Sequence, residues 1–263
     1  MGKYITAYKN ALSSAFQYRL NLGLLLVSHL VSLSGLLYLW IAVYDSGQTV
    51  GNYTLSGIIL YYVVLTVLRV TISEGVGMGF QVSEEINKGD ITHYLLKPFS
   101  YTLERFLKLV ATSTINMIVM GPIILILAII FRNAIPFPNT GGWALFGLFT
   151  FIGLAFYFLI YYLTALSAFW VHRGGSFIYG VLLFAGFLNG SVLPLDLFPA
   201  WFQPMSNMLP FQFLIFVPIQ AFLGRLANPV SLFMTALVWI TVFSLLIWFT
   251  WNRGVRKYEA VGR

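Results

Sequence analysis

Successive stretches of predominantly apolar residues run through this chain, and they constrain its fold more than any other feature. A helix needs about 20 such residues to cross the hydrocarbon core of a bilayer. Hydrophobic residues make up 59% of the chain and charged residues only 9%. Soluble domains carry about 45–50% apolar and about 25% charged residues, so a water-soluble fold has nowhere to bury this surface. We therefore predict an all-α integral membrane protein, with residues 1–263 forming a single transmembrane domain of six helices. The predicted spans are Leu22–Tyr44, Leu55–Ser73, Leu109–Phe131, Trp143–Val171, Ser176–Leu193 and Ser231–Trp251.

Basic residues predict the orientation of these spans. If the N-terminus is cytoplasmic, 13 of the 15 Lys and Arg residues fall on the inner side, counting Arg69, which is expected to reach from the second span to the second loop. Cytoplasmic loops carry such an excess. We expect both termini in the cytoplasm and a location in a bacterial plasma membrane. The net charge of +7 is expected to face anionic lipid headgroups, and no nucleic-acid partner is expected.

The first 20 residues predict an additional helix outside the spans. Apolar residues recur at helical spacing from Ile5 to Phe16, beside the basic Lys3, Lys9 and Arg19. This pattern is typical of a helix that lies at the inner membrane surface. A plain cytoplasmic extension of the first span is the alternative.

The apolar segment 194–229 differs from the predicted spans because it is rich in proline. It contains Pro199, Pro204, Pro210 and Pro218, and proline at this spacing breaks helices. We predict two short half-helices that enter the outer leaflet and return before the last span. Non-helical backbone at membrane depth must be covered by protein or face water, so this region is expected to pack against the bundle.

Residue types that support catalysis or ion transport are scarce in the predicted spans. Glu74 lies at the inner end of the second span, and His29 is the ionisable residue placed deepest inside a span. His29 is expected to bond to a neighbouring helix. The three histidines lack the spacing of metal ligands, and the chain has no cysteine. We expect no catalytic residue, metal site or cofactor on this chain, and these absences disfavour an intramembrane enzyme.

Gly75, Gly77 and Gly79 form a short alternating run at the end of the second span. The run does not meet the dinucleotide-binding fingerprint, and no phosphate-binding loop is present. Close helix packing, or a flexible end to the span, is the expected role.

Residues 81–100 form the most informative predicted loop, on the cytoplasmic side. Ser83 can cap a short helix whose first turn holds acidic residues, and Gly89 permits a left-handed end to it. A second apolar stripe begins at Ile91 and stops at Lys97 and Pro98. The pattern predicts two short amphipathic pieces joined at a glycine. A connector packed over the bundle and a docking element both fit this pattern.

Two motifs resemble a known family. The sequence from Glu85 to Ile91, followed by Tyr-Leu-Leu-Lys-Pro, resembles the cytoplasmic loop of ATP-binding-cassette type-2 permeases. The segments 193–204, 209–213 and 216–224 are similar to the outer re-entrant region of these permeases. The resemblance extends over essentially the whole chain.

The resemblance implies a membrane subunit of an ATP-driven exporter, with no ATPase site of its own. Two copies of a separate ATPase subunit, which binds the ATP and Mg, would dock on a coupling helix in the 81–100 loop. The chain would dimerise with itself or with a second permease. The implied contact residues are Glu84, Glu85, Ile86, Asn87, Lys88, Gly89, Asp90 and Ile91, flanked by Lys3, Lys9 and Arg19.

The expected cargo is amphipathic or lipid-like, because the predicted pathway lacks charge at depth. Two other functions stay open from the residues alone. A secondary transporter or channel would need ionisable residues inside the membrane. A membrane scaffold that transports nothing would need none.

Overall fold

The computed structural model describes residue 8 and residues 19–48, 50–72, 74–95, 100–130, 138–171 and 174–258. Within these ranges the chain is helical, which confirms the predicted all-α class. The α-helices are α2 (Arg19–Asp45), α3 (Leu55–Ile72), α4 (Glu74–Lys88), α5 (Ile91–Leu95), α6 (Tyr101–Ile130), α7 (Thr140–Ala165), α8 (Gly174–Leu188), α9 (Gln203–Met208), α10 (Phe216–Phe222) and α11 (Pro229–Lys257). The 3-10 turns are η1 (Leu166–Phe169), η2 (Leu195–Leu197) and η3 (Pro210–Leu214).

The predicted interfacial helix over residues 1–20, with Lys3 and Lys9, lies outside the described residues apart from two points. Tyr8 donates a hydrogen bond to Thr114 on α6 at 3.4 Å, and α2 begins at Arg19.

In the described part of the chain, 4 helical stretches are long and apolar enough to cross a membrane. They are Val27–Asp45, Leu55–Lys88, Thr140–Phe169 and Pro229–Lys257. Helix α6 has 30 residues, which also exceeds the length of about 20 that a crossing needs. Helix α8 has only 15 and is shorter than predicted.

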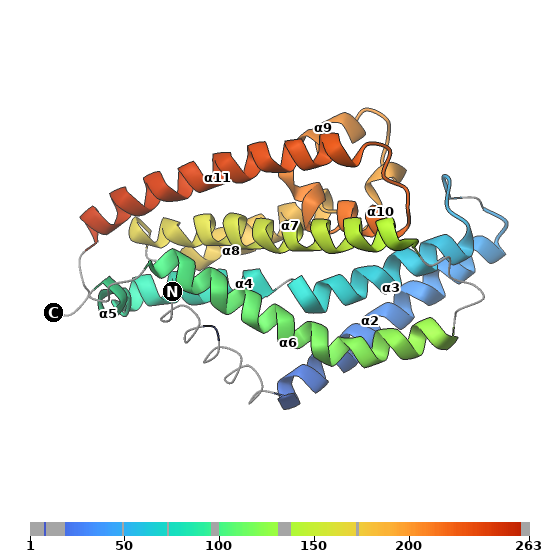
Figure 1. Cartoon of the computed structure of the whole chain (residues 1–263), viewed down its shortest axis with the longest axis horizontal. Coiled ribbons are helices and arrows are strands. Elements are labelled where there is room, and N and C mark those ends of the chain that lie inside the picture. The colour runs from blue at the N-terminus through green and yellow to red at the C-terminus, as the bar shows by residue number, and fades with distance from the viewer. Residues whose placement is uncertain are drawn as a thin grey trace.

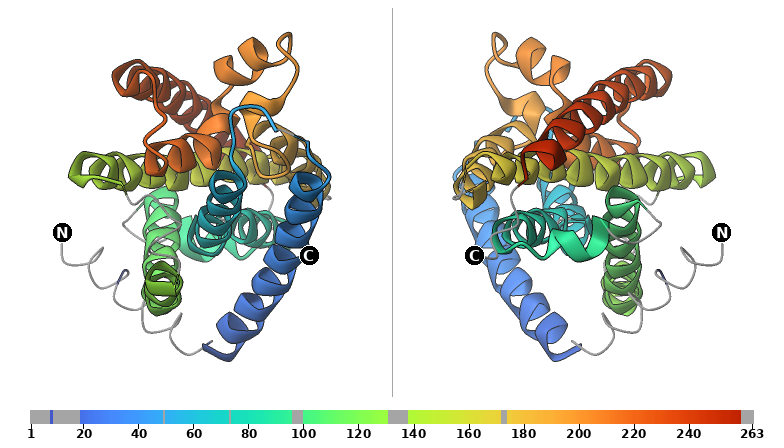
Figure 2. Two further views of the ribbon diagram at one scale, coloured as in Figure 1. Left: turned by 90° about the vertical axis from the view of Figure 1, so that its right-hand side faces the viewer. Right: turned by 90° about the vertical axis from the view of Figure 1, so that its left-hand side faces the viewer.

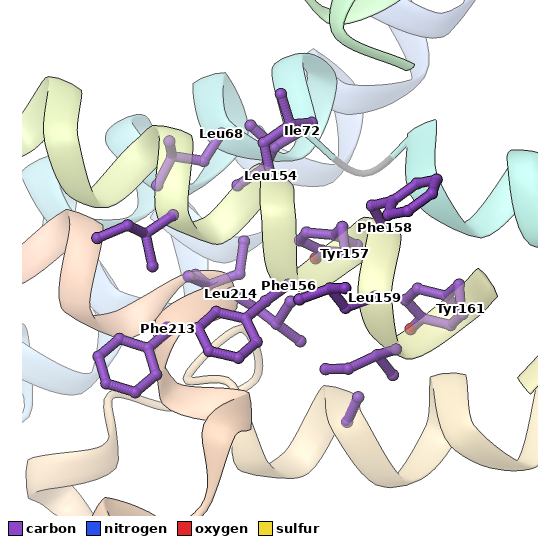
Figure 3. Close-up of a cluster of buried hydrophobic side chains, with 14 of the residues drawn as sticks. Leu68, Ile72, Leu154, Phe156, Tyr157, Phe158, Leu159, Tyr161, Phe213 and Leu214 are labelled. Carbon is purple, nitrogen blue, oxygen red and sulfur yellow. The ribbon is translucent and has the colours of Figure 1, made fainter. Parts of the chain in front are cut away.

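Helix α7 lies at the centre of the bundle. Figures 1 and 2 show it between α11 on one side and α4 and α6 on the other, and it contacts α4, α8, α10, α11 and η3. Its second half, from Ile152 to Ala165, is largely buried, and the side chains there are apolar or aromatic on nearly every face, as expected of a buried helix segment. Phe156 is fully buried and stacks on Phe213 of η3, with ring centroids 5.3 Å apart. Figure 3 shows this stack within the larger apolar cluster that α7 shares with α3.

Helix α3 ends at Ile72, one residue before the predicted end of the second span, and α4 begins at Glu74 and packs against α7. Gly75 and Gly79 lie against α7, where added Cβ atoms would stand 2.8 Å from Tyr157 Cβ and 3.1 Å from Tyr161 Cβ. The expected close packing is thus confirmed at these two glycines. Since small residues four apart let two helix backbones approach, α4 is held against α7 and extends to Lys88. The predicted cap at Ser83 is wrong, because Ser83 lies inside α4.

Helix α8 ends at Leu188, five residues before the predicted end of the fifth span. The chain turns at Gly190, whose φ is +83°. An added Cβ there would stand 2.7 Å from the Tyr61 hydroxyl and 3.0 Å from Phe216. The short helix therefore results from a turn that only glycine fits.

Side chains of α3 hydrogen-bond the backbone of this turn. Tyr61 donates to the Gly190 carbonyl at 2.7 Å, Tyr62 to the Val192 carbonyl at 3.0 Å and Arg69 to the Ser191 carbonyl at 3.3 Å. The expectation that Arg69 reaches the second loop is wrong, because its guanidinium reaches this turn instead. This turn precedes the predicted non-helical region 194–229, which packs against the bundle as expected through the contact of α10 with α7.

The proline-rich segment also forms the short helices that its prolines predicted. Helices α9 and α10 are separated by the 3-10 turn η3. Helix α10 is buried against α7, whereas α9 is largely exposed, with Met208 at 75%.

Candidate functional site

Helices α4 and α5 meet at Gly89, in the segment predicted to couple the chain to a partner. Gly89 has φ +91° and ends α4. Its carbonyl accepts hydrogen bonds from the backbone N–H of Thr92 at 3.2 Å and from the Thr92 hydroxyl at 2.9 Å. These bonds start α5 directly after the turn. The predicted pair of helices joined at a glycine is confirmed, although the first begins at Glu74.

The predicted contact residues divide between two sides of this segment. Ile86 and Ile91 are 3% and 0% exposed and form part of the core. Glu84 and Lys88 face outward, with side chains 61% and 63% exposed and an ion pair of 2.6 Å between them. Asp90 is also exposed, while Asn87 and Gly89 are half-buried. Only the outward residues can meet another protein without unfolding the loop.

Glu85 points into the protein. One carboxylate oxygen accepts a hydrogen bond from the Tyr101 hydroxyl at 2.6 Å and lies 2.8 Å from Arg105 Nη2. The other accepts from Gln81 Nε2 at 2.9 Å. Glu85 therefore anchors α4 to the start of α6 and is unsuited to a direct contact with a partner.

Arg105 is the centre of this arrangement, which we call the inner cluster (Glu85, Tyr94, Tyr101, Glu104 and Arg105). The guanidinium is 1% exposed and pairs with both carboxylates, its Nε lying 3.0 Å from Glu104. It also lies 4.8 Å from the ring centroids of Tyr94 and Tyr101. Burial disfavours its charge, but Tyr101, Glu104 and Glu85 outweigh burial and raise the pKa of Arg105. The inner cluster thus joins α4, α5 and α6.

The inner cluster was missed by the sequence prediction, which treated Arg105 only as a loop charge. Its further contacts extend to two other helices. Tyr101 stacks on Trp251 of α11, with centroids 5.4 Å apart, and Thr102 hydrogen-bonds Tyr162 of α7 at 2.9 Å. Through these contacts the residues around Arg105 connect α4 and α5 to α7 and α11 as well as to α6.

A cavity of about 640 Å³ lies beside the inner cluster, between α6, α7 and α11. Its walls are mainly apolar and aromatic, with a few hydroxyl groups. The lining residues include Thr102, Phe106, Phe158, Ser244, Trp248 and Trp251. Such a lining fits a ligand with much hydrocarbon and few polar groups.

A second polar group, the outer cluster (Tyr53, Asp196, Gln220 and Arg225), joins the first loop to the proline-rich segment. The Tyr53 hydroxyl donates to the Asp196 carboxylate at 2.9 Å and accepts from Gln220 Nε2 at 2.8 Å. The Arg225 guanidinium lies 4.4 Å from the Tyr53 ring centroid. Burial raises the pKa of Asp196. No sequence signal pointed to this cluster, because its members are as many as 172 positions apart.

The carboxylates and histidines of the described residues do not form a metal site. No group of three or more His, Cys, Asp or Glu side chains among them is placed to hold a metal ion. The inner and outer clusters are instead explained by their internal hydrogen bonds and ion pairs.

Comparison with known proteins identifies the family. A family model described as ABC-2 family transporter protein matches residues 30–262. Searches against curated proteins and against solved structures returned no match. The matched range includes α3 to α11 and most of α2, and so both polar clusters. The chain therefore belongs to the ABC-2 family of membrane transporter proteins and is a permease of that type.

Proposed function

We propose that this chain is the membrane subunit of an ATP-driven exporter, energised by a separate ATPase that docks on the outward side of α4 and α5. The observation that carries the proposal is the division of this segment into two sides. Glu84, Lys88 and Asp90 are exposed, while Glu85 is tied to the buried Arg105. An element that is charged outside and rigidly held inside is suited to receive a force and transmit it.

Three connections would carry the force from this contact into the membrane. The inner cluster links α4 to α6. Gly75 and Gly79 bring α4 against α7. Tyr101 reaches α11 through Trp251. A packed core responds to such a push by moving whole helices, because it is not continuously deformable.

The proposed topology has six spans in one domain, residues 1–263, with both termini in the cytoplasm of a bacterial cell. The spans would be α2, α3 with α4, α6 from Leu109 onward, α7, α8 and α11. Helix α8 is about 22 Å long at 1.5 Å per residue. The turn that follows it, whose backbone is hydrogen-bonded by side chains of α3, would complete the crossing. The segment 194–229 would be the outer re-entrant region. Residues 1–20 would lie at the inner membrane surface.

Dimerisation and partner stoichiometry follow the family resemblance. The chain would pair with a second copy or with a sister permease, and two ATPase subunits would supply the ATP and Mg sites. The proposed cargo is amphipathic or lipid-like. The aromatic cavity between α6, α7 and α11 supports this cargo class.

Affinity purification from native membranes tests the docking proposal. We expect the wild-type chain to recover an ATPase, and Glu84→Lys combined with Asp90→Lys to lose it, since both side chains are outside the packed core. Gln48→Lys, in the exposed first loop, is the matched control and should retain the ATPase. Glu85 is not a suitable test position, because its replacement would also disrupt the inner cluster.

Two results would contradict the proposal. One is a stable particle that contains no ATPase, as expected of a secondary transporter, a channel or a scaffold. The other is unchanged ATPase recovery in the Glu84 and Asp90 double variant.

A further inference from the structure

The last turns of α11 form a cavity that the proposed function does not use. It has a volume of about 440 Å³ and is lined by Trp170, Phe249, Thr250, Arg253 and Arg256. The larger cavity beside the inner cluster uses other residues of the same helix. The two cavities are therefore separate sites.

Two guanidinium groups give this cavity a positive charge. Arg253 and Arg256 are three positions apart, so they are neighbours on the helix surface, and both are exposed. The ion pairs among the described residues involve Lys88 and Arg105, so no described carboxylate neutralises either arginine of the cavity. Arg253 is oriented by Phe249, whose ring centroid lies 4.1 Å from the guanidinium carbon. Guanidinium groups pair strongly with phosphate oxygens.

The surface beside this charge is apolar. Trp170 is 42% exposed and Phe249 is 46% exposed at the cavity. Further along α11, Leu245 and Leu246 are also exposed. Tryptophan is enriched where a membrane protein meets the headgroup region. The cavity thus presents an anion-binding end and, next to it, a hydrocarbon-facing helix.

We propose that this cavity binds the phosphate headgroup of an anionic membrane phospholipid, whose acyl chains lie along the exposed side of α11. The inference rests on the proposed topology, which places this end of α11 at the cytoplasmic leaflet. That leaflet's anionic lipids attract basic side chains near the membrane surface. A lipid satisfies both parts of the site, whereas a soluble anion satisfies only the charge.

Such a lipid would also stabilise the helices that pack beneath the proposed coupling segment, α4 and α5. Gly254 lies between the two arginines and packs directly on the Phe169 ring in η1. The η1 segment also contacts α4, which is the helix that carries Glu84 and Lys88. Lipid bound to α11 would therefore stabilise the contact of α11 with η1 and, through η1, the position of α4. In this way it would regulate the response of α4 and α5 to their partner.

Lipid retention by the purified full-length chain tests the inference. The chain is reconstituted in nanodiscs of phosphatidylcholine with a minor fraction of phosphatidylglycerol, then extracted in neutral detergent, and its bound lipids are measured by mass spectrometry. We expect selective retention of phosphatidylglycerol. The double variant Arg253→Gln with Arg256→Gln should retain about tenfold less of it, because both charge-assisted contacts are lost. Lys257→Gln is the matched control, since Lys257 is basic and exposed on the same turn but does not line the cavity.

Three further measurements separate a lipid site from misfolding, from general charge attraction and from a soluble-anion site. Replacement of both arginines by lysine should restore most of the retention, which excludes misfolding as the cause of the loss. Equal losses in the Lys257→Gln variant would overturn the proposal in favour of general charge attraction. Full competition by inorganic phosphate would overturn it in favour of a soluble anion. No ATPase is needed, so these outcomes are independent of the docking experiment.

Discussion

The inner and outer clusters perform the same structural task with different chemistry. Each joins a helix-connecting segment to the bundle through partly buried polar groups. In the inner cluster the 1% exposed Arg105 is paired with two carboxylates. In the outer cluster the carboxylate of Asp196 is satisfied mainly by the neutral donors Tyr53 and Gln220, and Arg225 lies over a ring.

This difference determines how each end of the molecule tolerates change. Removal of one partner from a buried ion pair leaves an uncompensated charge, which is far more costly than the loss of a neutral hydrogen bond. The helices joined by the inner cluster should therefore be held more rigidly than the segments joined by the outer cluster. Rigidity there suits a segment that transmits force from a partner.

Replacement of Arg105 by Met should give the largest effect. Glu85 and Glu104 would lose their cation inside the protein, at a cost of about 3–5 kcal/mol in unfolding free energy. Thermal unfolding in detergent measures it. Lys88→Met, which breaks an exposed pair, is the control and should leave the unfolding temperature unchanged. Equal stability of the two variants would show that the buried ion pairs of Arg105 contribute no more than an exposed pair, and would contradict the rigidity assigned to the inner cluster.

Replacement of Gly75 by Val tests whether α4 is also held by packing. The added side chain would meet the backbone and Cβ of Tyr157, and overpacking of this kind costs about 1–3 kcal/mol. Gly77→Ala is the control, because its Cβ would meet only a Glu74 oxygen at 4.0 Å. If both variants unfold at the same temperature as wild type, the glycine contact does not hold α4.

Replacement of Tyr53 by Phe should have a smaller effect at the outer end. The hydroxyl bonds to Asp196 and Gln220 would be lost, at about 0.5–1.5 kcal/mol for a net hydrogen bond. The same unfolding assay applies. A loss as large as that of Arg105→Met would show that the outer cluster is as rigid as the inner one.

The smallest expected effect is the contribution of Asp196, in the outer cluster, to the pH dependence of stability. Burial raises the pKa of Asp196 above 3.8, so its protonated form is favoured in the folded state. Its contribution to stability is greatest below pH 3.8 and is lost as pH rises through the raised folded value. Asp196→Asn should remove this part of the pH profile. An unchanged profile in that variant would show that Asp196 does not titrate differently on folding.

The sequence predicted the features that depend on local pattern. The apolar stretches predicted an all-helical membrane protein, Gly89 predicted the turn between α4 and α5, and the prolines of 194–229 predicted short helices. Each of these follows from hydropathy or backbone preference within a few residues. The family resemblance followed from the same motifs.

The features that depend on packing were not predicted. Ser83 resembles a helix cap, but the contact of Gly75 and Gly79 with α7 extends the helix through it. Glu85 was predicted to contact the partner because it lies in the segment that resembles the cytoplasmic loop of the family. Its orientation is set instead by Arg105, 20 positions away on another helix. The pairing of Tyr53 with Asp196 spans 143 positions and has no local signal.

Thiol labelling at Glu84 tests the central claim most directly, because the chain has no cysteine of its own. A single Glu84→Cys variant is exposed to a membrane-impermeant maleimide in intact cells and in inverted membrane vesicles. Gln48→Cys, in the first loop, is the control for the outer face. We expect Glu84→Cys to be labelled only in inverted vesicles, and to be shielded there when the ATPase is bound. Labelling of Glu84→Cys in intact cells, or equal labelling with and without the ATPase, would contradict the proposed coupling contact.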